Sequence, residues 1–206
     1  MLNLHARATV GKAALPLARG LARAHVTADM LTVVGAVGVW ASALYFYPRG
    51  NFFWGSVVVT VFVLSDLLDG TLARLTGSQS AWGAFLDSTL DRVSDMAIFS
   101  GVALYFAGRG ADPLMSALAL YCLVSGVVVS YAKARAEGLG MTCNVGIAER
   151  SERLIVGLVA VGLGGLGIPY VLAVGLWLLA AAATFTVGER IVEVHRQVVA
   201  ARRTDG

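Results

Sequence analysis

The chain has 206 residues, of which 57% are hydrophobic and only 14% are charged. Soluble domains average roughly 45–50% apolar and about 25% charged residues, so this composition argues against a soluble protein. Sixteen Lys and Arg against thirteen Asp and Glu give a net charge of +3, without the interleaved aromatic and basic residues typical of nucleic-acid binding. We therefore expect one membrane domain over residues 1–206, with membrane lipid and no nucleic acid as a partner.

The N-terminal segment, residues 3–24, mixes basic and apolar residues. Val10, Ala14, Leu17 and Leu21 recur at helical spacing and can share one face. This pattern predicts an amphipathic helix that lies on the membrane surface. The alternative is a basic N-terminus without a fixed structure.

Six long apolar runs follow, and most approach or exceed the about 20 residues that a helix needs to cross a bilayer. They are residues 29–47, 52–75, 83–107, 112–136, 148–165 and 168–190. The sequence therefore predicts an all-α integral membrane protein with a bundle of six transmembrane helices over 29–190. A basic cytoplasmic tail is expected over 191–206.

The basic residues are distributed unevenly between the two sides of this predicted bundle. All the lysines and arginines except Arg49 and Arg109 precede the first span, follow the sixth, or flank the second-to-third and fourth-to-fifth connections. The positive-inside rule then places both termini and these connections in the cytoplasm. We expect a multi-pass protein of the cell membrane whose functional site faces the cytoplasm.

Four aspartates lie on the second and third predicted spans. Asp66 and Asp69 are three residues apart, and Asp87 and Asp91 are four residues apart, so each pair shares one helix face. The connection between the two spans, residues 76–80, is short and polar. It allows the helices to run antiparallel with their carboxylates converging near the cytoplasmic edge of the membrane.

A carboxylate within a span costs roughly 2.5–3.5 kcal/mol at its centre and less near the interface. Four such groups also repel each other, so a positive charge must offset them. Oxygen ligands without Cys or His favour a hard cation such as Mg²⁺, with Mn²⁺ as a second candidate. The alternatives are ion pairs with Arg74 and Arg92, or a pathway for protons or cations in a transporter.

The glycines and the arginine around the aspartates complete a longer pattern. Written out, it is Asp66-x2-Asp69-Gly70-x2-Ala73-Arg74-x8-Gly83-x3-Asp87-x3-Asp91. Its eight fixed residues and fixed gaps resemble the signature of the CDP-alcohol phosphotransferase family at every position. This resemblance implies a membrane-embedded transferase that acts on a CDP-linked lipid and forms a homodimer.

The resemblance also implies roles for the aspartates. Asp66, Asp69 and Asp87 are expected to be metal ligands, and Asp91 is expected to touch metal and to act as general base. The reaction would be a direct displacement at phosphorus. The alternative is an aspartate nucleophile that forms a covalent intermediate.

The family pattern further implies a set of contacts to the CDP-lipid. They are Asp29, Met30, Leu31, Thr32, Gly70, Arg74 and Ser80. Asp29 could instead be a charge favoured by the N-terminus of a helix. Ser80 could instead be a solvated loop serine.

Two further segments, residues 130–137 and 146–153, resemble the actinobacterial branch of the family that uses inositol phosphate. The resemblance implies transfer of the phosphatidyl group from CDP-diacylglycerol to inositol phosphate, giving phosphatidylinositol phosphate and CMP. Four cations are candidates for the acceptor phosphate, although cytoplasmic topology alone also supplies such residues. These acceptor cations are Lys133, Arg135, Arg153 and Arg190.

Several alternatives remain open at this point. Glycerol phosphate is the second candidate acceptor, because it is also phosphorylated and suits the same cations. A cation transporter is the alternative from another functional class. Arg150 could serve the substrate or pair with a neighbouring glutamate, and Asp95 is expected to support the metal ligands by hydrogen bonding.

Overall fold

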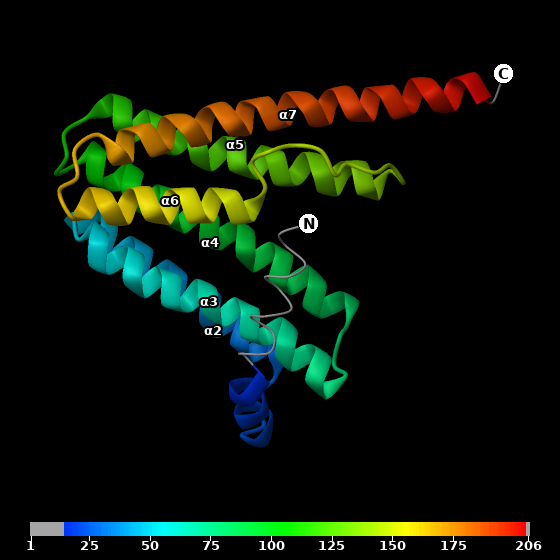
Figure 1. Cartoon of the computed structure of the whole chain (residues 1–206), viewed down its shortest axis with the longest axis horizontal. Helices are drawn as coiled ribbons and strands as arrows, with labels where there is room; N and C mark the ends of the chain where they lie inside the picture. Colours follow the sequence, from blue (N-terminus) through cyan, green and yellow to red (C-terminus); the bar gives the residue numbers. More distant parts are fainter. Residues whose placement is uncertain (1–14, 205–206) are drawn as a thin grey trace. The chain divides into compact units, whose positions relative to one another are not determined.

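A computed structural model describes residues 15–204, with the side chains of these residues other than Asp66, Leu67, Arg203 and Thr204. Over that stretch all long elements are helices and none is a strand, which confirms the all-α prediction (Figure 1). The helices α2 to α7 correspond one to one with the six predicted spans. They are α2 (Ala28–Phe46), α3 (Phe52–Thr76), α4 (Ala81–Ala107), α5 (Pro113–Gly138), α6 (Arg150–Gly165) and α7 (Val171–Thr204).

Four of these helices are long and apolar enough to cross a membrane, which supports a membrane protein. They are α2 with the turn that follows it, α3, α5 and α7. The first half of α4 carries three aspartates and an arginine between residues 87 and 95, which lowers its hydropathy. Helix α6 has 16 residues, and at about 1.5 Å per residue it is shorter than the roughly 30 Å of a bilayer core. The six predicted helices are thus present in the described residues and four of them are candidate membrane spans, while six crossings stay a prediction.

The structure describes part of each predicted terminal segment. Residues 15–23 are helical, in agreement with the predicted surface helix over 3–24, whereas residues 3–14 lie outside the described part. The predicted basic tail over 191–206 is helical as far as Thr204, because α7 continues without a break to that residue, and its place in the cytoplasm stays a prediction. Its polar residues continue the helix beyond the apolar span, where hydropathy alone marked an end.

Side chains at the helix starts explain several of the boundaries. The Thr27 and Ser80 hydroxyls accept hydrogen bonds from the Met30 and Gly83 amides, at 3.2 and 3.0 Å, and so cap α2 and α4. Asp112 caps α5 in the same way, with Pro113 in the first turn. Gly77 follows the end of α3 with a φ of +66°, a conformation that glycine adopts without strain.

The described residues divide into two compact units, and the first comprises residues 15–45 and 57–98. In this unit α2 and α3 lie side by side (Figure 1). A Cβ added at Gly38 would lie 2.2 Å from the Phe62 ring, and one at Gly35 would lie 3.0 Å from the Ser65 hydroxyl. Glycine at both positions therefore allows the two helices to approach closely.

The second unit comprises residues 46–56 and 99–204. Here α7 packs along α5 and α6 (Figure 1). The buried side chains of Val129, Ala148 and Ala183 form a small apolar core between α5, the connection to α6, and α7. At Gly165 an added Cβ would lie 2.3 Å from the Phe53 amide nitrogen, so this glycine allows a backbone to pass against α6.

Candidate functional site

The signature aspartates lie on α3 and α4, within the first unit. Asp69 is only 6% exposed, and the Asp91 side chain is 14% exposed. The side chain of Asp66 lies outside the described part of the structure. Among the side chains that are described, no group of three or more acidic, histidine or cysteine residues is arranged to hold a metal. The four-carboxylate metal site therefore stays a prediction.

Asp69 is held by a contact that the sequence did not reveal. The Thr32 hydroxyl, on α2, donates a hydrogen bond of 2.6 Å to Asp69 Oδ2, and both residues are buried. The same hydroxyl lies 3.0 Å from the Ala28 carbonyl. Since a hydroxyl has one proton, we assign it to the shorter, charge-assisted contact. Thr32, predicted to contact the CDP-lipid, thus orients a candidate metal ligand.

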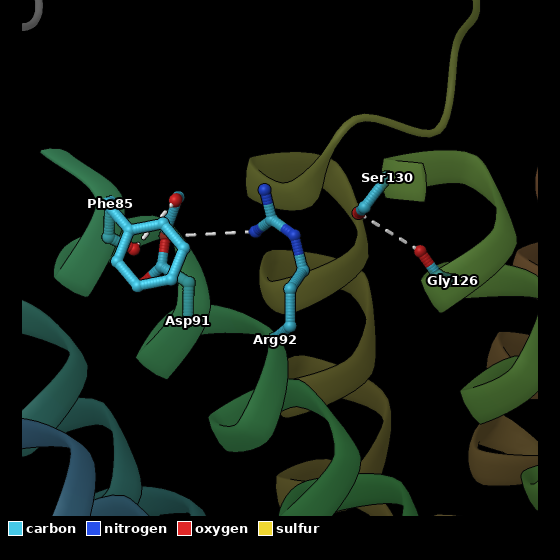
Figure 2. A network of polar contacts seen from close by, with 6 residues as sticks. Phe85, Asp91, Arg92, Gly126 and Ser130 are labelled. Atoms are coloured by element: carbon cyan, nitrogen blue, oxygen red, sulfur yellow. Dashed lines mark hydrogen bonds and ion pairs between the residues drawn. The ribbon is translucent and has the colours of Figure 1, made fainter. Parts of the chain in front are cut away.

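Asp91 has a positive neighbour on its own helix. Arg92 Nη1 lies 3.8 Å from Asp91 Oδ2, an ion pair that Figure 2 shows. Asp95 follows one turn later and is also buried, with 8% exposure. The alternative of ion pairing with Arg92 is therefore observed for Asp91, and it places one guanidinium beside the acidic face of α4.

The start of α2 and the start of α4 meet in the first unit. A Cβ added at Gly83 would lie 3.4 Å from both Asp29 Oδ1 and the Ser80 hydroxyl. Gly83 of the signature thus lies beside Asp29 and Ser80, two of the predicted CDP-lipid contacts. Met30 differs from them, because its side chain is 55% exposed. Ser80 is exposed and caps α4, so both its predicted lipid contact and the alternative of a solvated loop serine stay open.

Gly70 and Arg74 are adjacent on α3. A Cβ at Gly70 would come 3.7 Å from Arg74 Nη1, which shows that the guanidinium folds back along the helix over the glycine. Thr71, which is buried, accepts a hydrogen bond of 3.2 Å from Arg74 Nη2. Thr71 was not among the predicted site residues, although its spacing of three residues from Arg74 was a usable signal.

The acceptor cations all lie in the second unit, and they differ in environment. Arg135 is exposed and Lys133 is half-buried. Arg153 and Arg190 are each only 3% exposed. The positive-inside rule accounts for cations at the membrane surface, and it does not by itself explain why Arg153 and Arg190 are buried.

Both buried arginines bond to backbone carbonyls. Arg153 Nη1 donates to the Ala148 carbonyl at 3.0 Å. Its Nε lies beside Gly126 of α5, where an added Cβ would be 3.2 Å away. Arg190 Nε donates to the Val145 carbonyl at 3.1 Å, and its Nη1 donates to the Val129 carbonyl. The same region of α5 has a local bond from the Ser130 hydroxyl to the Gly126 carbonyl (Figure 2).

The chemistry of the first-unit side chains fits a hard divalent cation. All the candidate ligands are carboxylates, and neither cysteine of the chain lies among them. The buried Asp69 carboxylate has one oxygen fixed by Thr32, an arrangement typical of a ligand whose direction is set by a second residue.

Two known proteins, one of them represented by two solved structures, resemble this chain over most of its length. The phosphatidylinositol phosphate synthase of Streptomyces avermitilis is 50% identical over 204 residues, which cover 96% of this chain and 84% of that protein. Two solved structures of the Mycobacterium tuberculosis phosphatidylinositol phosphate synthase each share 42% identity and a TM-score of 0.85. Each alignment covers 88% of this chain. It covers 92% of the structure with CDP-DAG bound and 88% of the structure in complex with manganese and citrate.

The family comparison covers both units and includes every residue of the signature. The sequence model described as CDP-alcohol phosphatidyltransferase matches residues 25–188, from the cap of α2 to the middle of α7. This range contains the buried Asp69, the half-buried aspartates of α4 and the buried Arg153. With this match and with a relative that is 50% identical over 96% of it, the chain belongs to the CDP-alcohol phosphatidyltransferase family.

Proposed function

We propose that this enzyme transfers the phosphatidyl group of CDP-diacylglycerol to inositol phosphate, with phosphatidylinositol phosphate and CMP as products. The observation that carries the proposal is the buried Asp69 within a complete family signature on α3 and α4. The relatives named above are phosphatidylinositol phosphate synthases, and one was solved with CDP-DAG. Together they support both the donor and the acceptor.

The chemical step is a displacement at the phosphorus that carries the diacylglycerol. The acceptor hydroxyl oxygen forms a new bond to this phosphorus, and the bond from phosphorus to the oxygen that bridges to CMP breaks. The electron pair of that bond leaves with CMP. Asp91 takes the proton of the attacking hydroxyl, which is the role of a general base.

We propose Asp66, Asp69, Asp87 and Asp91 as the ligands of Mg²⁺ or Mn²⁺. A bound divalent cation supplies positive charge that neutralises the diphosphate and the departing CMP. The Mycobacterium tuberculosis relative was solved with manganese, which supports a divalent metal. In this chain Thr32 holds Asp69 in place, and Arg92 adds a positive charge beside Asp91.

The CDP-lipid side uses the residues around the starts of α2 and α4. We propose that Arg74 pairs with a phosphate oxygen of the donor, with Thr71 holding its guanidinium. Gly70 leaves the space over which this guanidinium lies. Asp29, Met30, Leu31 and Ser80 complete the proposed contact set.

The acceptor phosphate is assigned to the acceptor cations of the second unit. A guanidinium carries five N–H donors, and Arg190 uses two of its nitrogens to hold backbone carbonyls. Donors therefore remain on Arg190 for a phosphate. Its burial favours such a role, because a buried charge needs a partner of opposite sign.

The arrangement in the membrane is proposed on the charge pattern. Six crossings by α2 to α7, with both termini and the functional site on the cytoplasmic side of the cell membrane, agree with the excess of arginine and lysine there. A homodimer rests on the family resemblance alone. Cross-linking in membranes before detergent extraction would test it, and only monomer at high cross-linker concentration would contradict it.

The assignment of the acceptor is tested with purified protein, Mg²⁺, CDP-diacylglycerol and a panel of alcohols. We expect CMP release with inositol phosphate and far less with inositol or glycerol phosphate. Preference for glycerol phosphate would make the enzyme a phosphatidylglycerophosphate synthase instead. Asp91→Asn gives the background rate for each acceptor.

A further inference from the structure

The connection between α5 and α6, residues 139–149, is tied to α7 by a line of polar side chains. Thr186, Arg190, Glu193 and Gln197 are spaced by four, three and four residues, so they share one face of α7. We call these four residues the α7 polar stripe. Gln197 Nε2 donates to the Thr142 carbonyl at 2.6 Å and to Glu193 Oε1 at 2.8 Å. The Thr142 amide donates in return to Gln197 Oε1 at 3.1 Å.

Thr186 is the fully buried member of this stripe, with 0% exposure. Its hydroxyl oxygen accepts hydrogen bonds from two successive amides, those of Ile147 at 3.1 Å and Ala148 at 3.0 Å. Its methyl group lies against Gly146, where an added Cβ would be 2.3 Å away. Gly146 has a φ of +116°, a conformation that side chains rarely adopt. The two residues therefore fit each other closely.

The two peptide groups that Thr186 fixes lie between the two peptide groups whose carbonyls hold the buried arginines. The amide of Ala148 bonds to Thr186, while its carbonyl accepts from Arg153 Nη1. The other amide that bonds to Thr186 is that of Ile147. Two residues before it, the carbonyl of Val145 accepts a hydrogen bond from Arg190 Nε. One side chain of α7 thus fixes a short backbone segment that contacts both guanidinium groups.

We propose that Thr186 is a positioning residue for the acceptor phosphate. It does not touch the substrate. It holds residues 145–148 so that their carbonyls fix the directions of Arg153 and Arg190. This inference rests on the proposed function, because it takes these two arginines as phosphate ligands. It adds a residue that neither the family signature nor the charge pattern points to.

The test compares two variants of the full-length protein that differ in one chemical group. Thr186→Val keeps the shape and removes the oxygen that accepts from both amides, whereas Thr186→Ser keeps that oxygen. We expect Thr186→Val to raise the KM for inositol phosphate about 10- to 100-fold, with the KM for CDP-diacylglycerol changed less than about twofold. Thr186→Ser should stay within about threefold of the wild type in both.

Thr184→Val is the matched control, since it removes a threonine hydroxyl from the same helix two residues earlier. The Thr184 hydroxyl donates to the Ala180 carbonyl and lies 2.6 Å from the Tyr121 hydroxyl, away from the α5–α6 connection. Both KM values should match the wild type in this variant. A rise in the acceptor KM as large as that of Thr186→Val would overturn the proposal.

Equal rises of the two KM values in Thr186→Val, or an unchanged acceptor KM, would also overturn it. If that variant does not fold, Thr186→Ala removes the same oxygen without placing a methyl group against the amides. Hydrogen exchange of residues 145–149 gives a reading independent of turnover, with faster exchange expected in Thr186→Val and not in Thr186→Ser. If the wild type prefers glycerol phosphate, the proposed acceptor is wrong, and the same KM comparison with glycerol phosphate then decides the role of Thr186.

Discussion

The two units hold their functional side chains in different ways. In the first unit, side chains hold side chains: Thr32 bonds to Asp69, Thr71 bonds to Arg74, and Arg92 pairs with Asp91. In the second unit, the buried Arg153 and Arg190 are held by backbone carbonyls. The first arrangement depends on helix register, and the second depends on the path of the chain between α5 and α6. The two contacts within one helix, Thr71 with Arg74 and Arg92 with Asp91, are therefore visible in sequence spacing, whereas the bond from Thr32 and the carbonyl contacts of the second unit are not.

The largest effect is expected in the first unit, at the proposed general base. Asp91→Asn keeps the shape of the side chain but cannot accept the proton, so kcat should fall about 10²- to 10⁴-fold. CMP release at saturating substrates measures this. Arg92→Gln, which removes only the ion pair, should lower kcat far less. Retention of more than a tenth of kcat in Asp91→Asn would assign the base elsewhere.

The next effect should come from the second unit, where a buried arginine bridges two carbonyls. Arg190→Lys keeps the charge and cannot hold the same geometry. Loss of a charged hydrogen bond costs about 2 kcal/mol, which corresponds to an acceptor KM raised about 30-fold. Arg74→Lys makes the same substitution in the first unit. Its KM for inositol phosphate should not change, because Arg74 is exposed and is proposed to contact the CDP-lipid. Similar acceptor KM values in the two variants would remove the distinction between the units.

A smaller effect is expected from the bond between α2 and α3. Thr32→Val removes the donor to Asp69, which should weaken metal binding about tenfold, as for other residues that orient metal ligands. Calorimetric titration with Mn²⁺ measures binding without turnover. Thr32→Ser keeps the hydroxyl and should bind metal like the wild type. Unchanged Mn²⁺ affinity in Thr32→Val, with a raised KM for CDP-diacylglycerol, would return Thr32 to the lipid contacts.

The smallest effect concerns the cap of α4. Ser80→Ala removes the acceptor for the Gly83 amide and should lower the free energy of unfolding by about 1 kcal/mol. Ser80→Asn retains a cap and should restore stability, as measured by thermal unfolding in detergent. A raised KM for CDP-diacylglycerol in Ser80→Asn, despite restored stability, would show that Ser80 also contacts the donor.

Helix positions and the acidic face could be predicted from sequence because both follow from short-range periodicity. The six apolar runs matched α2 to α7, and Gly70 lies beside Arg74, four residues later, as helical spacing implies. The helix α7 runs beyond the predicted sixth span, since hydropathy records where apolar residues stop and not where the helix stops. The cap by Ser80 could have been found from its position three residues before Gly83.

The contacts of Thr32 and of the buried arginines could not be predicted. Thr32 and Asp69 are 37 residues apart, and nothing in either local sequence identifies the other as its partner. Arg153 and Arg190 were expected as cationic ligands at the membrane edge, yet their partners include carbonyls of an irregular segment. Every residue has a carbonyl, so the choice of Val145 and Ala148 depends on the folded path alone.

The α7 polar stripe has a consequence for the length of the chain. Thr186 and Gln197 contact the α5–α6 connection from positions eleven residues apart on one helix. Each inserted residue rotates the remainder of a helix by about 100°, so a single insertion between them would turn one end of the stripe away from its partners. Substitutions there alter individual bonds, whereas insertions and deletions misalign the whole set. We expect related enzymes to vary in sequence between these two positions and to keep their spacing, with length differences falling outside this stretch.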